Sequence, residues 1–188
     1  MLKFLKENAD NVVKLLVNQI AMTIFGLLLS AATFSNKTLL LVTGILSILF
    51  YMYLLYTSAW DIVSGDKIRI DGGRMEKMPL KGLYLAIIAN AVNIILSLVV
   101  IICYYLGEYL LLQWAANTTA IAYNILWLLN GMYISVLSFA NAVPLKFYLM
   151  LASVIPALIT CAIAYTAGTK NFRIFGFLGL NYRGGKRR

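Results

Sequence analysis

The sequence predicts an all-α integral membrane protein, a polytopic helical bundle whose N- and C-termini both lie in the cytoplasm. Hydrophobic residues make up 62% of the 188 residues and charged residues only 12%, which is outside the usual range of soluble domains. Long uncharged stretches alternate with short charged segments, and nearly all the basic residues can be placed on one side of a membrane. We therefore expect a single multi-pass domain over residues 1–188, in a plasma membrane.

Five uncharged stretches are long enough to enter a membrane, since crossing its hydrocarbon core takes about 20 apolar residues. They cover residues 15–36, 38–60, 82–107, 109–145 and 147–169. The first stretch follows three lysines but is longer than the roughly 7–15 apolar residues of a secretory signal. It is therefore expected to be a retained span.

The distribution of basic residues favours an even number of crossings. Fourteen of the sixteen Lys and Arg residues fall on the cytoplasmic side if stretch 109–145 enters and leaves the membrane at the same face, which leaves only Lys37 and Lys146 outside. Short cytoplasmic loops carry such an excess of basic residues. This arrangement has four full spans plus a re-entrant or split segment, and the alternative is five plain spans with the tail outside.

Stretch 109–145 is itself irregular. It is longer than one span requires, and it contains two candidate break points, at residues 116–119 and at Asn130-Gly131. A helical hairpin that dips into the bilayer, or two short spans, would fit, provided that protein or water shields the irregular backbone. The alternative is an interfacial helix over 109–116 followed by one ordinary span.

Loop 61–81 is expected at the cytoplasmic surface, because it holds five basic and four acidic residues. Basic and apolar residues alternate at 67–70, just before an Asp-Gly-Gly sequence at 71–73. This pattern predicts a short surface β-hairpin in a solvated loop with local ion pairs.

The tail, residues 170–188, carries six basic residues and no acidic one. Near an anionic leaflet each basic residue contributes about 1 kcal/mol of attraction. We expect the tail to bind anionic lipid headgroups at the cytoplasmic face, and we expect no nucleic-acid partner, because no aromatic stacking platform accompanies the basic run. The candidate lipid-binding residues are Arg183, Lys186, Arg187 and Arg188.

Asparagines inside the stretches are the candidates for ligand binding. Amides avoid lipid and face neighbouring helices or a wet cavity. They can form hydrogen bonds between helices, or they can line a site for a small neutral solute. The candidate ligand-binding residues are Asn90 and Asn93, which share one face of the third span, and Asn124 and Asn130 in stretch 109–145.

The last span carries a stripe of small residues, Ala157, Cys161, Ala164 and Gly168. Small residues let helices approach closely, so the stripe predicts a packing seam within the bundle or between subunits. Pro156 predicts a kink in the same span. Cys161, like Cys103, is expected to be a packing residue.

The residue inventory argues against catalysis and against a metal or cofactor. The chain has no His, all seven acidic residues lie outside the uncharged stretches, and no phosphate-binding or dinucleotide-binding glycine motif is present. The two cysteines do not have the spacing of a metal site. We expect no enzymatic activity, no cofactor and no metal site.

The sequence Asp71-Gly-Gly-Arg74, followed by Pro79-Leu-Lys81-Gly82 and then Ile-Ala89-Asn90, resembles a group of small bacterial membrane proteins that have no assigned activity. Those proteins are similar in having a basic, Gly-rich inner loop and a basic segment after the last span. The resemblance implies a bacterial plasma membrane and implies no particular function.

Two functions are compatible with these features. The first is a small transport-related or solute-binding membrane subunit for a neutral polar ligand, which would use the asparagine-bearing faces and the irregular fourth stretch. The second is a non-catalytic membrane scaffold or accessory subunit, which would bind partner proteins and anionic lipid. Either could form a homo-oligomer or join a partner membrane subunit.

Overall fold

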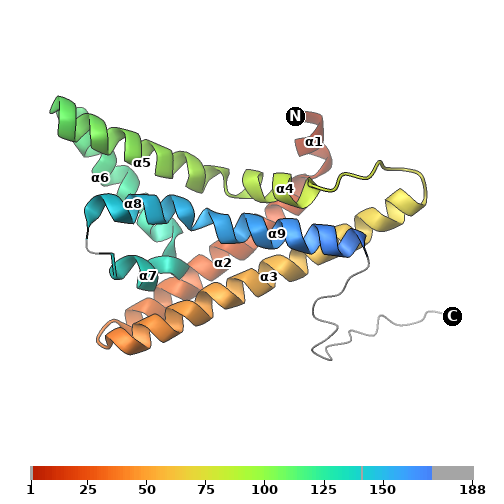
Figure 1. Cartoon of the computed structure of the whole chain (residues 1–188), viewed down its shortest axis with the longest axis horizontal. Helices are drawn as coiled ribbons and strands as arrows, with labels where there is room; N and C mark the ends of the chain where they lie inside the picture. Colours follow the sequence, from red (N-terminus) through yellow and green to blue (C-terminus); the bar gives the residue numbers. More distant parts are fainter. Residues whose placement is uncertain (1, 141, 171–188) are drawn as a thin grey trace.

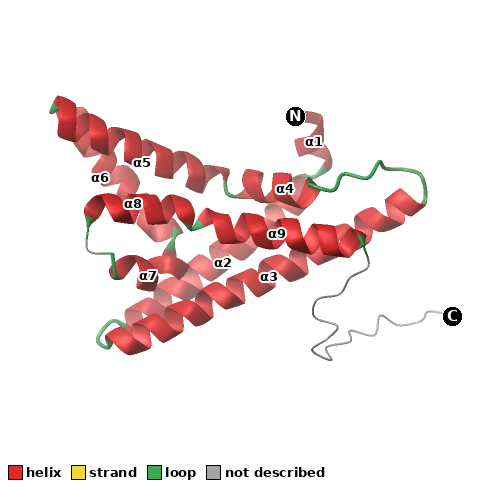
Figure 2. Cartoon of the chain, viewed as in Figure 1, coloured by secondary structure: helices red, strands yellow, loops and turns green. Residues whose placement is uncertain are grey.

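The structure, a computed structural model, describes residues 2–140 and 142–170. All the regular secondary structure in these ranges is helical, and the long helices α2, α3, α5 and α9 run roughly along one long axis (Figures 1 and 2). Four helices are long and apolar enough to cross a membrane, and one bent pair of helices passes the same test. The predicted all-α polytopic bundle is confirmed.

The chain begins with the short helix α1 (Leu2–Glu7) and continues into α2 (Ala9–Thr33). A tight turn at residues 34–36 leads into α3 (Lys37–Asp71). Asn36 caps α3, since its side-chain oxygen accepts hydrogen bonds from the backbone N–H groups of Thr38 (3.0 Å) and Leu39 (3.2 Å). The two helices therefore form an antiparallel hairpin.

Helix α3 is longer than the span predicted at 38–60. Its 35 residues extend about 52 Å, whereas the hydrocarbon core is about 30 Å thick. The predicted β-hairpin at 67–73 is wrong, because these residues continue α3 and then end it. Gly73 has φ 68°, and the Arg74 N–H donates to the Arg69 carbonyl at 2.9 Å, so the Asp-Gly-Gly sequence serves as a helix C-terminus.

The third span is divided into α4 (Lys81–Ala89) and α5 (Ala91–Leu110). The division falls at Asn90, whose side-chain amide donates to the Ala86 carbonyl at 2.9 Å. The last span is divided in the same way into α8 (Val143–Ala152) and α9 (Val154–Thr169). Pro156 has no N–H to donate to the preceding turn, and the helix is interrupted at Ser153. The bend of the predicted kink stays a prediction.

Between these spans lies a bent helical segment made of α6 (Gln113–Leu129), the 3₁₀ turn η1 (Gly131–Tyr133) and α7 (Ile134–Ser138). The two arms are bent by 80° at Asn130. The predicted break at Asn130-Gly131 is confirmed, whereas residues 116–119 continue α6 without a break. We call this segment the re-entrant hairpin.

Both ends of the re-entrant hairpin lie at the same end of the bundle. Helix α6 follows the C-terminus of α5 directly and packs along α5. Helix α8, which follows the hairpin, begins beside that same C-terminus: the Tyr105 and Tyr148 hydroxyls are 2.8 Å apart, and the Tyr104 and Phe147 ring centroids are 5.1 Å apart. Both ends of the segment therefore lie at one end of the bundle, which is the arrangement expected if the segment enters and leaves the membrane at one face.

The opposite end of the bundle collects the C-termini of α3 and α9 and the N-terminus of α4, and we call it the basic end. Gly168 of α9 contacts Val63 of α3, and a Cβ placed at Gly82 of α4 would lie 2.6 Å from the Cys161 carbonyl oxygen. Phe4 of α1 packs edge-on against Tyr84 of α4, with ring centroids 6.4 Å apart. The start of the chain and Lys170 therefore share this end (Figure 1).

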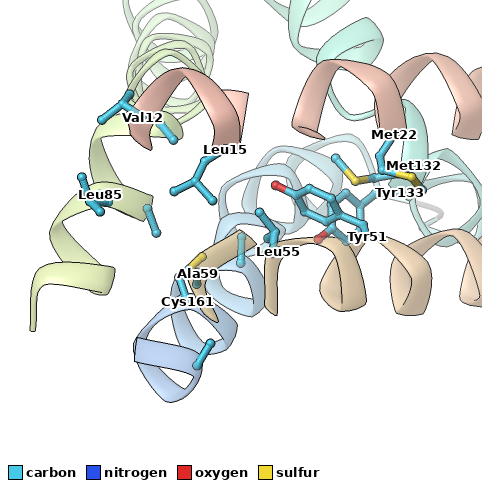
Figure 3. Close-up of a cluster of buried hydrophobic side chains, with 14 of the residues drawn as sticks. Val12, Leu15, Met22, Tyr51, Leu55, Ala59, Leu85, Met132, Tyr133 and Cys161 are labelled. Atoms are coloured by element: carbon cyan, nitrogen blue, oxygen red, sulfur yellow. The ribbon is translucent and has the colours of Figure 1, made fainter. Parts of the chain in front are cut away.

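Part of the buried hydrophobic core lies where α2, α3, α9 and the re-entrant hairpin meet. Figure 3 shows Tyr51, Tyr133, Met22 and Met132 gathered at this place. The small-residue stripe of α9 is buried throughout, against α3 and α4, so this seam lies within the bundle. Both cysteines are buried and unpaired, as packing residues would be.

Candidate functional site

The most polar part of the buried interior is a cluster of three side chains, Asn93, Asn130 and Ser153, which we call the amide cluster. Asn130 donates to the Asn93 side-chain oxygen at 3.1 Å and accepts from the Ser153 hydroxyl at 2.7 Å. Asn130 is 0% exposed, and the other two side chains are also buried. The cluster joins α5, the tip of the re-entrant hairpin and the interruption between α8 and α9.

Three helix interruptions meet at this level of the bundle. Each occurs at a polar residue whose side chain bonds to a carbonyl of the preceding turn: Asn90 to Ala86, Asn130 to Leu126 and Ser153 to Met150. Such side-chain bonds compete with the helical ladder and often accompany bends. Neither Asn90 nor Ser153 caps the following helix with its side chain, so the first N–H groups of α5 and α9 have no side-chain acceptor there.

The hairpin tip reaches this level because glycines allow it to approach α2 closely. A Cβ at Gly26 would lie 2.6 Å from the Met132 backbone nitrogen, and a Cβ at Gly131 would contact the Thr23 carbonyl oxygen. The Thr23 hydroxyl also donates to the Leu129 carbonyl at 2.9 Å, which satisfies one of the last carbonyls of α6. Irregular backbone at membrane depth is thus shielded by protein.

Two hydroxyls on the hairpin are buried and have no hydrogen-bond partner among the described residues. They belong to Tyr133, which is 7% exposed, and to Ser135, which is 1% exposed. Ser135 lies directly against Gly44 of α3, where its hydroxyl can contact the glycine Cα–H group. The Tyr133 hydroxyl retains a donor and an acceptor that a small polar molecule could satisfy.

The structure brings together three of the four candidate ligand-binding asparagines. Asn93 and Asn130 bond directly, and Asn90 is buried on the same face, one turn before Asn93. Asn124 lies apart from them: it is exposed on α6, and its amide donates to the Ala120 carbonyl of its own helix at 2.9 Å. Ser153 and Tyr133 were not among the candidates, although a serine three residues before a proline in an apolar span is a usable signal.

A second buried polar group lies at the basic end, where the sequence predicted a solvated loop. The Lys81 ammonium nitrogen lies 2.7 Å from Asp66 Oδ2, and the Tyr165 hydroxyl donates to the same oxygen at 2.9 Å. The Lys81 and Asp66 side chains are each only 4% exposed. We call these three residues, which come from α4, α3 and α9, the ion-pair site.

The ion-pair site corrects the expectation of a solvated loop for two of its nine charged residues, since Asp66 and Lys81 are buried and the other seven are exposed or half-buried. Asp66 lies inside α3 and Lys81 opens α4, and the packing of α9 over both excludes water from them. Opposite charges fifteen positions apart in sequence follow no helical or strand spacing, so sequence reasoning could not pair them. Lys81, one of the fourteen basic residues assigned to the cytoplasmic side, is therefore buried in the protein and does not lie at the membrane surface.

The candidate lipid-binding residues Arg183, Lys186, Arg187 and Arg188 lie outside the described residues, so their role stays a prediction. Within the described part of the chain, no group of three His, Cys, Asp or Glu side chains is arranged to hold a metal ion. The amide cluster contains no ionisable side chain. Its chemistry is that of neutral hydrogen-bond donors and acceptors in an apolar surrounding.

Comparison with known proteins found no matching family model, no matching curated protein and no matching solved structure.

Proposed function

We propose that the protein is a non-catalytic, transport-related membrane subunit that binds a small neutral polar solute at the hairpin tip. One observation carries the proposal: the interruptions at Asn90, Asn130 and Ser153 converge on one buried polar layer within the bundle. Discontinuous helices near the middle of the bilayer form the solute sites of many transporters, because their ends offer unpaired backbone groups. The proposed setting is a bacterial plasma membrane with the basic end in the cytoplasm.

The neutral character of the cluster supports a neutral solute. Amides and hydroxyls bind carbonyl, amide or hydroxyl groups of a solute without the desolvation penalty of a buried charge. The nearest charged group along the α4–α5 span is Lys81, about 18 Å from Asn93 at 1.5 Å per residue, and it is already paired with Asp66. Glycerol and urea represent this class of solute.

The Tyr133→Phe variant tests the proposal without threatening the fold. The Tyr133 hydroxyl has no partner among the described residues, so its removal should leave the thermal unfolding temperature unchanged or slightly raised. In liposomes containing the full chain, stopped-flow light scattering should show glycerol or urea entry faster than in protein-free liposomes. The variant should slow this entry.

A matched pair of amide variants on one helix controls for folding. Asn130→Ala removes a buried amide and leaves the Asn93 side-chain oxygen without its donor, so it should cost about 1–3 kcal/mol of stability and abolish solute entry. Asn124→Ala, on the exposed face of α6, should change neither quantity much. Equal permeability of wild-type and protein-free liposomes to both solutes, together with no solute-induced rise in unfolding temperature, would overturn the proposal.

A scaffold or accessory role is the second candidate, and one observation favours it. Asn93, Asn130 and Ser153 already satisfy one another, as expected of amides that only tie helices together. Under this function the basic tail would bind anionic lipid and other faces would bind partner proteins. The scaffold role predicts that Asn130→Ala lowers stability and that the wild-type chain itself gives no solute flux.

A further inference from the structure

We infer that the chain forms a symmetric dimer in the membrane through one face of α6, in which like residues of the two copies meet. The face consists of Gln113, Asn117, Ala120 and Asn124, and we call it the amide seam. All four residues are exposed. This inference is independent of whether the hairpin tip binds a solute.

The first step is the depth at which these amides are exposed. Helix α6 starts at the outer end of the hairpin, and Asn124 lies about 16 Å along the helix from Gln113, roughly halfway through the hydrocarbon core. Polar side chains at this depth face protein or water-filled cavities. Asn124 donates to the Ala120 carbonyl but receives no hydrogen bond on its own side-chain oxygen within the described chain, so the monomer leaves this amide incompletely bonded.

The second step is the spacing. The seam residues follow one another at intervals of four, three and four positions, which is the pattern of a left-handed helix–helix seam. Ala120 in its middle leaves room for the backbone of a second helix to approach. Positions on one flank of the seam carry large apolar side chains, such as Ile121 (65% exposed) and Trp114 (57% exposed), which suit lipid.

The third step identifies the occupant as a second copy of this chain. All copies insert with the same orientation, because the basic end fixes it. A two-fold axis relating two copies must then be parallel to the membrane normal, and a helix beside such an axis packs against its own copy in parallel and in register. Each seam residue therefore meets its equivalent.

Asparagine and glutamine suit this geometry because each carries both a donor and an acceptor. Two copies of Asn124 can exchange a pair of hydrogen bonds across the axis, and so can two copies of Asn117. Charged residues would repel one another at these positions, and the seam contains none. Two Ala120 residues between them set the distance.

Disulfide crosslinking in membrane vesicles tests the arrangement. A disulfide requires Cβ atoms about 3.5–4.5 Å apart, which the axis provides at position 120. Ala120→Cys should give mostly crosslinked dimer after mild oxidation, whereas Ile121→Cys, also exposed but 100° around the helix, should give much less. The wild-type chain serves as the background, because both native cysteines are buried.

A second measurement separates association from folding. Asn124→Leu and Ala120→Phe alter positions that face outward in the monomer, so they should retain the unfolding temperature that the wild-type chain shows at dilutions where it too is monomeric. Asn124→Leu should lower the dimer association constant in lipid nanodiscs or dilute liposomes roughly eightfold, for two lost hydrogen bonds of the measured size. Ala120→Phe should leave only monomer.

The inference is overturned if wild-type protein is monomeric in lipid, or if Ala120→Cys and Ile121→Cys crosslink equally. It is also overturned if dimers persist unchanged in Ala120→Phe. Crosslinking of Ala120→Cys to a different protein in place of a second copy would show that the seam binds another subunit, and would equally refute the dimer.

Discussion

Asp66 and Lys81 illustrate how a single buried contact can organise the end of a membrane bundle. The carboxylate accepts from an ammonium group on one helix and from the Tyr165 hydroxyl on another. Burying two charges is costly, and their attraction offsets that cost only when the geometry is good and further hydrogen bonds are present. The pair therefore ties α3, α4 and α9 in one arrangement, and its value depends on both partners being present.

Breaking the pair from one side should be far worse than removing both charges. Lys81→Met leaves a buried carboxylate without its cation and should lower the free energy of unfolding by about 3–5 kcal/mol. The double variant Asp66→Asn with Lys81→Met should recover much of that loss. Thermal unfolding of the four proteins of this cycle in detergent checks the prediction, and additive losses in the double variant would contradict it.

Glycines make a comparable difference at the scale of helices. Gly26 and Gly131 allow the backbone of the hairpin tip to contact α2, and Gly44 makes room for Ser135. Without these contacts the amides of the tip could not reach Asn93 or Ser153. The position of the amide cluster therefore depends on glycines, because they lack the side chains that would keep the helices apart.

Substituting alanine at two helical glycines should change the stability of the protein in opposite directions. In Gly26→Ala the new Cβ would lie 2.6 Å from the Met132 backbone nitrogen, so the tip must shift, at a cost of about 1–3 kcal/mol. In Gly65→Ala nothing lies within 4 Å of the new atom, and the better helix former should stabilise α3 by up to about 1 kcal/mol. Unfolding temperatures measure both effects, and a neutral Gly26→Ala would contradict the proposed docking of the tip.

Helix interruptions are where sequence reasoning succeeded and failed most clearly. Asn130-Gly131 was a predictable break because a polar residue and a glycine interrupt an apolar stretch, and Pro156 indicated a kink in the span that is interrupted at Ser153. The break at Asn90 was not predicted, because asparagine is tolerated in helices and its bond to the Ala86 carbonyl becomes decisive only in the packed bundle. The β-hairpin at 67–73 was predicted from the alternation of basic and apolar residues, and the same sequence is also compatible with the end of a helix.

At the scale of the whole molecule, the helices that are long and apolar enough to cross a membrane were predictable, because hydropathy is a property of segments. The contacts between segments were not. Asn93 with Asn130, and Asp66 with Lys81, are joined by how the hairpin and α9 pack, and no local spacing encodes either pair. Three of the four candidate asparagines proved to share one layer, while the exposed position of Asn124, on the face of α6 that points away from the bundle, became apparent only from the packing of α6.

The topology makes a prediction that two positions on the re-entrant hairpin test together. Leu111 precedes α6 and Ala142 follows α7, and both are exposed at the end of the bundle opposite the basic end. If the basic end is cytoplasmic, single cysteines at both positions should react with a membrane-impermeant maleimide in intact cells, as should a cysteine at Asn36. A cysteine at Gly72, next to the basic end, should react only after the cells are opened.

The wild-type chain gives the background of this labelling experiment, since its cysteines are buried within the bundle. Five plain spans would place Leu111 and Ala142 on opposite sides, because a single crossing would then separate them. Labelling of one position and protection of the other would therefore refute the re-entrant hairpin. The proposed solute site, which lies at the tip of that hairpin, would be refuted with it. Labelling of both from outside fixes the entry and exit of the segment at one face, and with them the cytoplasmic position of the basic tail.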